Sequence, residues 1–164
     1  MWKSLNLIQI KKMKKSKLFV LLCVLSGACS SPSKDITPPE ILPQGDYASP
    51  VNCQVFERGS VLPFAYAFSD DVELGSYNLE IHNNFDHHTH STEAGECPQD
   101  AVQRPEHPWI YNQSFEIPAG STVFEASRSI SIPLDIDPGE YHFMIRVTDA
   151  SGWQELKSLS IRIL

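Results

Sequence analysis

Residues 139–149 read Gly-Glu-Tyr-His-Phe-Met-Ile-Arg-Val-Thr-Asp. In this stretch Tyr, Phe, Ile and Val alternate with His, Met, Arg and Thr, which is the period of a strand with one face on a hydrophobic core. Similar runs occur near residues 38–42, 52–57, 61–69, 76–83, 111–117, 128–136 and 156–163. Turn-forming residues separate these runs, and no helical period competes with them. The sequence therefore predicts an all-β fold, an antiparallel β-sandwich of about seven to eight strands.

Two segments resemble known sandwich modules. Residues 139–152 are similar to the penultimate strand and turn of bacterial Ig-like and cadherin-like modules, and Thr37-Pro38-Pro39-Glu40-Ile41 is similar to their opening strand. The resemblance implies an Ig-like sandwich in which residues 76–83 form strand C, 111–117 strand D and 140–148 strand F. The connection between strands C and D is then a long insertion, and long loops without a regular period are uncommon unless they carry a function.

The N-terminal 28 residues have the composition of a targeting segment. Six of the 13 Lys and Arg, and none of the 20 acidic residues, lie before Cys29, and the apolar block 18–25 is followed by Ser-Gly-Ala. This arrangement resembles a bacterial lipoprotein signal peptide, with residues 1–28 removed and Cys29 acylated; Met13 is an alternative start, and an ordinary secretory signal is the alternative interpretation. We expect residues 29–36, rich in Ser and Pro, to form a tether, and residues 37–164 to form the domain.

The charge of the exported part limits its partners. From Cys29 onward the chain has seven Lys and Arg against 20 acidic residues, a net charge of −13. A nucleic-acid backbone requires a basic footprint, so nucleic acid is excluded as a partner. Contact with a membrane is expected through the lipid anchor alone.

Histidines concentrate at the start of the insertion. His82, His87, His88 and His90 are four of the six histidines and fall within nine positions. Imidazole is the commonest metal-binding side chain, and His-x-His spacing allows two rings to approach one ion. We expect a site for a divalent transition metal, zinc first and copper second; a polar His-rich loop without a ligand is the alternative.

The strand pattern adds His142 to this group. Alternation in strand C turns Ile81 toward the core and His82 outward, and alternation in strand F buries Phe143 and turns His142 outward. Strands C and F are antiparallel neighbours in an Ig-type sheet. His82 and His142 are therefore predicted to lie side by side on the outer face of one sheet, as a rigid half-site.

The insertion would supply a mobile half-site. His88 and His90 share the His-x-His spacing and are the preferred ligands, whereas His87 points away from His88 in an extended chain. Ligand histidines commonly donate their second N–H group to an acceptor, and Asp86 and Glu93 are candidates for that role.

The cysteines add a constraint on the insertion. Cys23 leaves with the signal and Cys29 is the lipidation site, so Cys53 and Cys97 remain outside the reducing cytoplasm. We expect them to form a disulfide that ties the far end of the insertion to the edge strand. Two free thiols are the alternative, and a Cys97 thiolate could then join the metal.

The remaining residues give weaker evidence for a binding or catalytic site than the histidines do. Asp70, Asp71 and Asp149 fall in turns; similar residues hold calcium in cadherin-like modules, but the sequence lacks a dense loop of oxygen ligands, so we interpret them as turn caps. His107 is interpreted as loop structure, and the aromatic segment that starts at Trp109 as packing rather than a sugar-binding platform. No nucleophile is paired with a base, and no phosphate-binding glycine loop is present, so we do not expect an enzyme.

The chain as a whole resembles a family of small lipoproteins from Bacteroides-type bacteria that is catalogued as a domain of unknown function. The resemblance rests on the signal, on the Thr-Pro-Pro-Glu-Ile opening, on Ile-His-Asn-Asn-Phe-Asp-His-His-Thr-His at residues 81–90, and on the Gly-x-Tyr-His strand. It implies an exported domain, anchored to the outer membrane, that works near a metal-uptake transporter or another envelope protein. We therefore expect a lipid-anchored metal-binding protein; an adhesion or carbohydrate-binding module and a small metalloenzyme are the alternatives.

Overall fold

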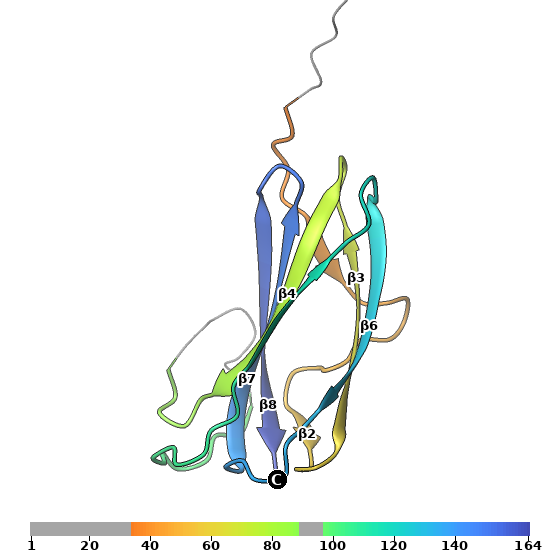
Figure 1. Cartoon of the computed structure of the whole chain (residues 1–164). Coiled ribbons are helices and arrows are strands. Elements are labelled where there is room, and N and C mark those ends of the chain that lie inside the picture. Colours follow the sequence, from red (N-terminus) through yellow and green to blue (C-terminus); the bar gives the residue numbers. More distant parts are fainter. Residues whose placement is uncertain (1–33, 89–96) are drawn as a thin grey trace, which may run out of the picture. The chain divides into compact units, whose positions relative to one another are not determined.

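The computed structural model of the chain describes residues 34–88 and 97–164 (Figure 1). These residues form a compact unit that begins at Lys34, whereas the sequence places the domain boundary at Thr37. The strands are β1 (Glu40–Leu42), β2 (Gln54–Phe56), β3 (Val61–Ser69), β4 (Leu74–Asn83), β5 (Tyr111–Glu116), β6 (Val123–Ser131), β7 (Gly139–Asp149) and β8 (Gln154–Ile163). Over the same two ranges, no helix has the length and apolar character needed to cross a membrane.

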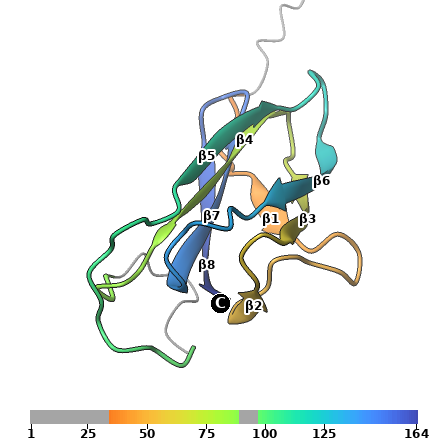
Figure 2. The same cartoon turned by 60° about the horizontal axis from the view of Figure 1, so that its bottom comes forward.

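The strands form two sheets that pack face to face, as Figures 1 and 2 show. The smaller sheet has the order β1-β3-β6, and the larger has the order β2-β8-β7-β4-β5. All pairs are antiparallel except β2 with β8, which is parallel. The predicted all-β sandwich is confirmed, and the extra edge strand expected near residues 52–57 is β2.

Two strands differ from the sequence prediction. Strand β6 covers 123–131 rather than 128–136, because it pairs with β3 along its whole length and Pro133, without an N–H group, cannot extend the ladder. Strand β5 pairs with β4 in the larger sheet, which is the position of strand C′ rather than strand D of an Ig-type sandwich. The insertion therefore joins two neighbouring strands of the larger sheet.

The core between the sheets is rich in aromatic residues. Phe64 from the smaller sheet lies 6.1 Å from Tyr77 and 6.0 Å from Phe143 of the larger sheet, measured between ring centroids. These three side chains are at most 1% exposed. Residues on alternate positions of β4 and β7 fill this core, so the positions between them lie on the opposite, outer face of the larger sheet. The histidines of interest occupy those outer positions.

Tyr141 joins the start of β7 to the end of the insertion. Its hydroxyl donates a hydrogen bond to the backbone oxygen of Asp137 at 2.6 Å and accepts one from the backbone N–H of Trp109 at 3.3 Å. Trp109 is 6% exposed, so it packs in the core, in agreement with the interpretation of this segment as packing. The end of the insertion is thereby fixed to the strand that carries His142.

Candidate metal centre

His82 and His142 form a cross-strand pair. They are directly opposed in the register of β4 and β7, with the core residues Ile81 and Phe143 opposed one position along. Both Ile81 and Phe143 are fully buried, so the two histidines lie on the outer face of the larger sheet. Their ring centroids are 5.5 Å apart. The side-by-side placement that the strand pattern predicts is present.

The surroundings of His142 differ from the expectation of an exposed residue. Its side chain is on the outer face, yet it is only 1% exposed. The reason is that the insertion folds back over this end of the sheet, so that Nε2 of His142 lies 3.0 Å from the backbone oxygen of His88. Alternation predicts the direction of a side chain but not whether another segment of the chain covers it. At this end of the sheet, the insertion therefore buries the outer face around His142.

A tight turn at residues 84–88 places His88 over the sheet. The backbone N–H of Asn84 donates to the oxygen of Glu140 at 2.8 Å, and that of His87 donates to the oxygen of Asn84 at 3.2 Å. His87 adopts a left-handed conformation, with φ of 57°, which reverses the chain. The ring of Phe85 packs edge-on against Tyr141 at 5.3 Å and anchors the turn.

Three imidazoles consequently converge. The ring centroid of His88 lies 5.5 Å from that of His82 and 5.2 Å from that of His142. With zinc–nitrogen distances of about 2.0–2.1 Å, and each nitrogen about 1.1 Å from its ring centre, rings arranged tetrahedrally around one ion have centroids about 5 Å apart. The ring centroids of these three residues are close to that spacing, but the described residues whose ligand atoms all lie within 4.8 Å of one another do not include the three histidines, so their rings would have to rotate to share one ion. A histidine set of this kind also suits copper.

Two of the three rings, those of His88 and His142, have a hydrogen-bond partner at one nitrogen, whereas the ring of His82 has a carboxylate nearby without a hydrogen bond at that nitrogen. Nδ1 of His88 lies 2.5 Å from Oδ1 of Asp86, Nδ1 of His82 lies 3.1 Å from Oε1 of Glu80, and Nε2 of His142 faces the His88 carbonyl. An acceptor at one nitrogen favours a proton there and the lone pair on the other. This arrangement would assign Nε2 of His88 and Nδ1 of His142 as the ligand atoms.

The electrostatics of the turn agree with this arrangement. The hydrogen bond to His88 is the main cause that lowers the pKa of Asp86, so the carboxylate stays ionised beside the ring. The sequence predicts this orienting role for Asp86. It does not single out Glu80, although the place of Glu80 two residues before His82 on the same face of β4 is a readable signal.

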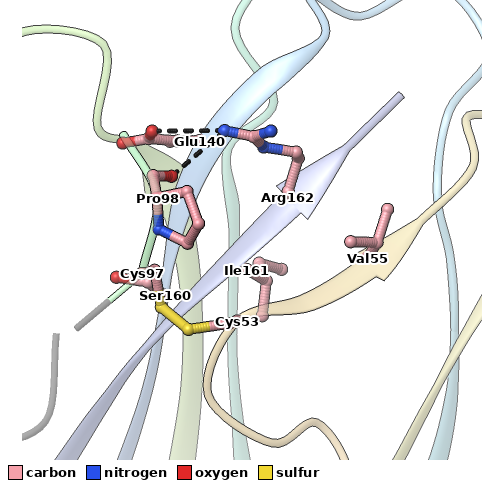
Figure 3. Close-up of a pocket in the computed structure, with 8 residues that line it drawn as sticks. All are labelled: Cys53, Val55, Cys97, Pro98, Glu140, Ser160, Ile161 and Arg162. Carbon is pink, nitrogen blue, oxygen red and sulfur yellow. Dashed lines mark hydrogen bonds and ion pairs between the residues drawn. A yellow bond between two sulfur atoms is a disulfide. The ribbon is translucent and has the colours of Figure 1, made fainter. Parts of the chain in front are cut away.

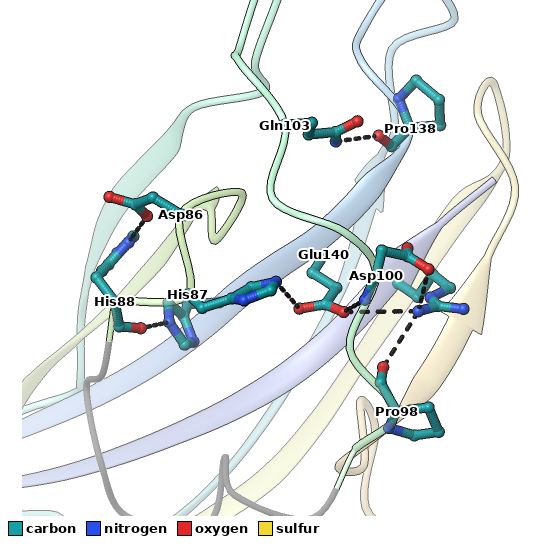
Figure 4. Close-up of polar contacts among 10 residues, drawn as sticks. Asp86, His87, His88, Pro98, Asp100, Gln103, Pro138 and Glu140 are labelled. Carbon is teal, nitrogen blue, oxygen red and sulfur yellow. Dashed lines mark hydrogen bonds and ion pairs between the residues drawn. The ribbon is translucent and has the colours of Figure 1, made fainter.

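His87 takes a different direction. Its Nε2 lies 3.9 Å from Oε2 of Glu140, away from His88, as expected for adjacent residues (Figure 4). Glu140 also accepts a hydrogen bond from the backbone N–H of Asp100 and faces Arg162, which contacts Asp100 Oδ1 at 2.9 Å. This network holds the returning part of the insertion to the sheet rather than contributing to the three-ring cluster.

The predicted disulfide between Cys53 and Cys97 is present, with Cα atoms 5.3 Å apart. It borders a small hollow of about 130 Å³ that Val55, Ile161 and Arg162 also line (Figure 3). The disulfide removes Cys97 from the candidate metal ligands, because an oxidised sulfur is no thiolate donor. The far end of the insertion is thereby fixed to the segment that leads into β2.

The remaining candidates divide into two groups. His90, Glu93 and Cys29 lie outside the described residues. His107 is exposed in a loop, where its backbone N–H donates to Asp137, as interpreted from the sequence. The predicted turn caps are confirmed for Asp70 and Asp149, whose Oδ1 atoms accept backbone hydrogen bonds from the turns that follow.

The fold and the site together define an Ig-type β-sandwich with a histidine cluster on the outer face of its larger sheet. Comparison with known families agrees with the sequence resemblance at this level. The chain belongs to the family described as Domain of unknown function (DUF4625), whose model matches residues 27–164. No curated protein matches the chain.

Proposed function

We propose that this protein binds a divalent transition metal, zinc first and copper second, for capture or delivery at the cell envelope. The observation that supports the proposal is the three-ring cluster of His82, His88 and His142, in which the rings of His88 and His142 each have a hydrogen-bond partner at one nitrogen.

Capture would use the sheet and the insertion together. The acidic surface concentrates cations near the protein. The hydrogen-bonded ladder between β4 and β7 holds the backbones of His82 and His142 side by side, so the pair is in place before an ion binds. His88 completes the set from a turn anchored by Phe85. His90, two residues further along, is the proposed fourth ligand, and delivery would proceed by exchange of this fourth position with a partner.

The cellular setting is part of the proposal. The segment before Cys29 has the order of a lipoprotein signal, and the disulfide between Cys53 and Cys97 suits an oxidising compartment. We propose that a lipid on Cys29 holds the domain at the outer membrane, where an envelope protein or metal transporter receives the ion. Substitution Cys29→Ser should then move the protein from the membrane fraction to the soluble fraction.

The direct test is elemental analysis and zinc titration of the purified protein, comparing wild type with His82→Ala, His142→Ala and His88→Ala. Each substitution removes one ligand and should weaken zinc binding by about tenfold to a hundredfold or more. His107→Ala is the matched control, since it removes a histidine from an exposed loop and should leave the affinity unchanged. Zinc affinity should also fall steeply below about pH 6.5, the reference pKa of imidazole, because protons compete for the ligand nitrogens.

Full-strength binding in both His82→Ala and His142→Ala would remove the strand pair from the site. An affinity for zinc that is equal at mildly acidic and neutral pH would exclude histidine ligands altogether.

A further inference from the structure

A second group of candidate ligands lies at the opposite end of the sandwich. Asp35 precedes β1, Asp70 follows β3, and Asp149 ends β7. One carboxylate oxygen from each of the three lies within 4.8 Å of the others. The turns β3–β4 and β7–β8 and the first described residues meet at this end (Figure 1). Asp149 and His142 are seven positions apart along β7, about 23 Å at the rise of a strand, so the two sites are distinct.

Each carboxylate uses one oxygen to fix local backbone. Oδ1 of Asp70 accepts hydrogen bonds from the N–H groups of Val72 and Glu73, at 2.9 and 2.7 Å. Oδ1 of Asp149 does the same for the N–H groups of Ser151 and Trp153, both at 2.8 Å. Oδ1 of Asp35 accepts the N–H of Thr37 at 3.0 Å. These bonds orient the carboxylates but occupy only half of their oxygens.

The second oxygen of each carboxylate, Oδ2, indicates what the cluster could bind. Oδ2 of Asp35, of Asp70 and of Asp149 is buried and has no hydrogen-bond partner. Asp35 is 8% exposed and Asp149 is 4% exposed, so water does not solvate these side chains. Among residues 34–88 and 97–164, no Lys, Arg or His forms an ion pair with any of the three. Three carboxylates so close together repel one another when ionised, and a cation between them would compensate this charge.

The geometry points to a calcium-binding site formed by Asp35, Asp70 and Asp149. Calcium takes oxygen ligands at about 2.3–2.6 Å, so two oxygens on one ion lie at most about 5 Å apart, and the three carboxylates are close enough together to meet this requirement. The ligands are all carboxylate oxygens, which suit calcium better than zinc, because zinc prefers nitrogen and sulfur. Asp70 also lines a hollow of about 300 Å³.

Calcium here would have a structural consequence. Asp70 directly follows a strand of the smaller sheet and Asp149 ends a strand of the larger one, and Asp35 lies where the chain enters the domain. One ion would join both sheets to this first segment. It would fix the direction in which the chain leaves the sandwich toward the proposed lipid anchor, an effect independent of the histidine cluster.

Trp153 provides a site-specific probe. Its backbone N–H binds Oδ1 of Asp149, and its indole Nε1 donates to the backbone oxygen of Asp35 at 3.3 Å. Terbium, a luminescent substitute for calcium, should therefore show emission sensitised by Trp153 when it is added to the purified protein. Calcium should quench this emission by displacement, whereas magnesium should do so only at much higher concentration because it demands a smaller, regular octahedral site.

The variants Asp35→Asn, Asp70→Asn and Asp149→Asn keep an oxygen for the turn hydrogen bonds while removing a charge, and each should weaken calcium binding by about tenfold or more. Asp71→Asn, an exposed neighbour outside the cluster, is the matched control and should bind like wild type. Zinc titration of the same variants checks folding, because the histidine cluster should be unaffected. Absence of sensitised terbium emission from wild type, unchanged calcium affinity in all three Asn variants, or equal affinity for magnesium and calcium would each overturn the assignment.

Discussion

Removing the disulfide tests how far the insertion depends on its covalent link to the sandwich. Cys53 and Cys97 are separated by 44 positions, so the bond closes a loop of that length in the unfolded chain. Loop-closure entropy for such a loop corresponds to about 4 kcal/mol at 25 °C. The double variant Cys53→Ser/Cys97→Ser should therefore lose roughly 3–4 kcal/mol of unfolding free energy, which is a drop of roughly 10–15 °C in Tm for a domain of this size.

The folded structure should survive this loss. The backbone N–H of Cys53 still donates to Ser160 at 2.8 Å, and Arg162 still contacts Asp100 and the Pro98 oxygen. Thermal and urea unfolding, followed by circular dichroism, measure the difference. A reducing agent should bring wild type to the Tm of the double variant and leave the variant unchanged. A loss below about 1 kcal/mol would refute the reasoning, because the cross-link would then not restrict the unfolded chain.

Three further predictions concern single positions. Tyr141→Phe removes both hydrogen bonds of a buried hydroxyl and should cost about 1–2 kcal/mol of stability, measured by urea unfolding, with the exposed Tyr47→Phe as a neutral control. Gly139→Ala should cost about 2–3 kcal/mol of stability and weaken zinc binding, because φ is 140° and a Cβ would lie 2.8 Å from the Phe85 ring. Gly120→Ala is the control: its φ is 78° and the space around it is open, so it should show the backbone cost alone and leave zinc binding unchanged. Burial raises the pKa of Tyr141 above 10.0, so the folded state favours the neutral phenol. The contribution of Tyr141 to stability should be constant below that pH and fall as pH rises above it, and a fall of equal size in Tyr141→Phe would contradict this assignment.

Much of the fold can be predicted from the local alternation of apolar and polar residues. In β4 and β7 the apolar positions are regular, so the faces of His82 and His142 and their pairing can be predicted from the sequence. The predicted bounds of β6 are wrong because its sequence, Val-Phe-Glu-Ala-Ser-Arg-Ser-Ile-Ser, has small or polar residues at most positions and its partner β3 defines it. The local sequence pattern also does not predict the sheet to which β5 belongs, because that depends on which strand its backbone pairs with.

The site is predictable in part for the same reason. Sequence spacing indicates the histidines and the acceptor role of Asp86, which is local to His88. It does not indicate that the insertion buries His142, because that cover comes from a segment more than fifty positions away. Composition places Asp35 in the tether, and its juxtaposition with Asp70 and Asp149 arises only when both turns and the first segment meet in space.

The central claim is that imidazole nitrogens of His82, His88 and His142 bind one transition-metal ion. X-ray absorption spectroscopy at the zinc edge of the purified, zinc-loaded protein tests it most directly. We predict a first shell of light atoms at about 2.0–2.1 Å with the outer-shell scattering of at least three imidazole rings, reduced by one ring in His142→Ala. A shell without imidazole scattering, or a spectrum that is identical in wild type and His142→Ala, would contradict the account.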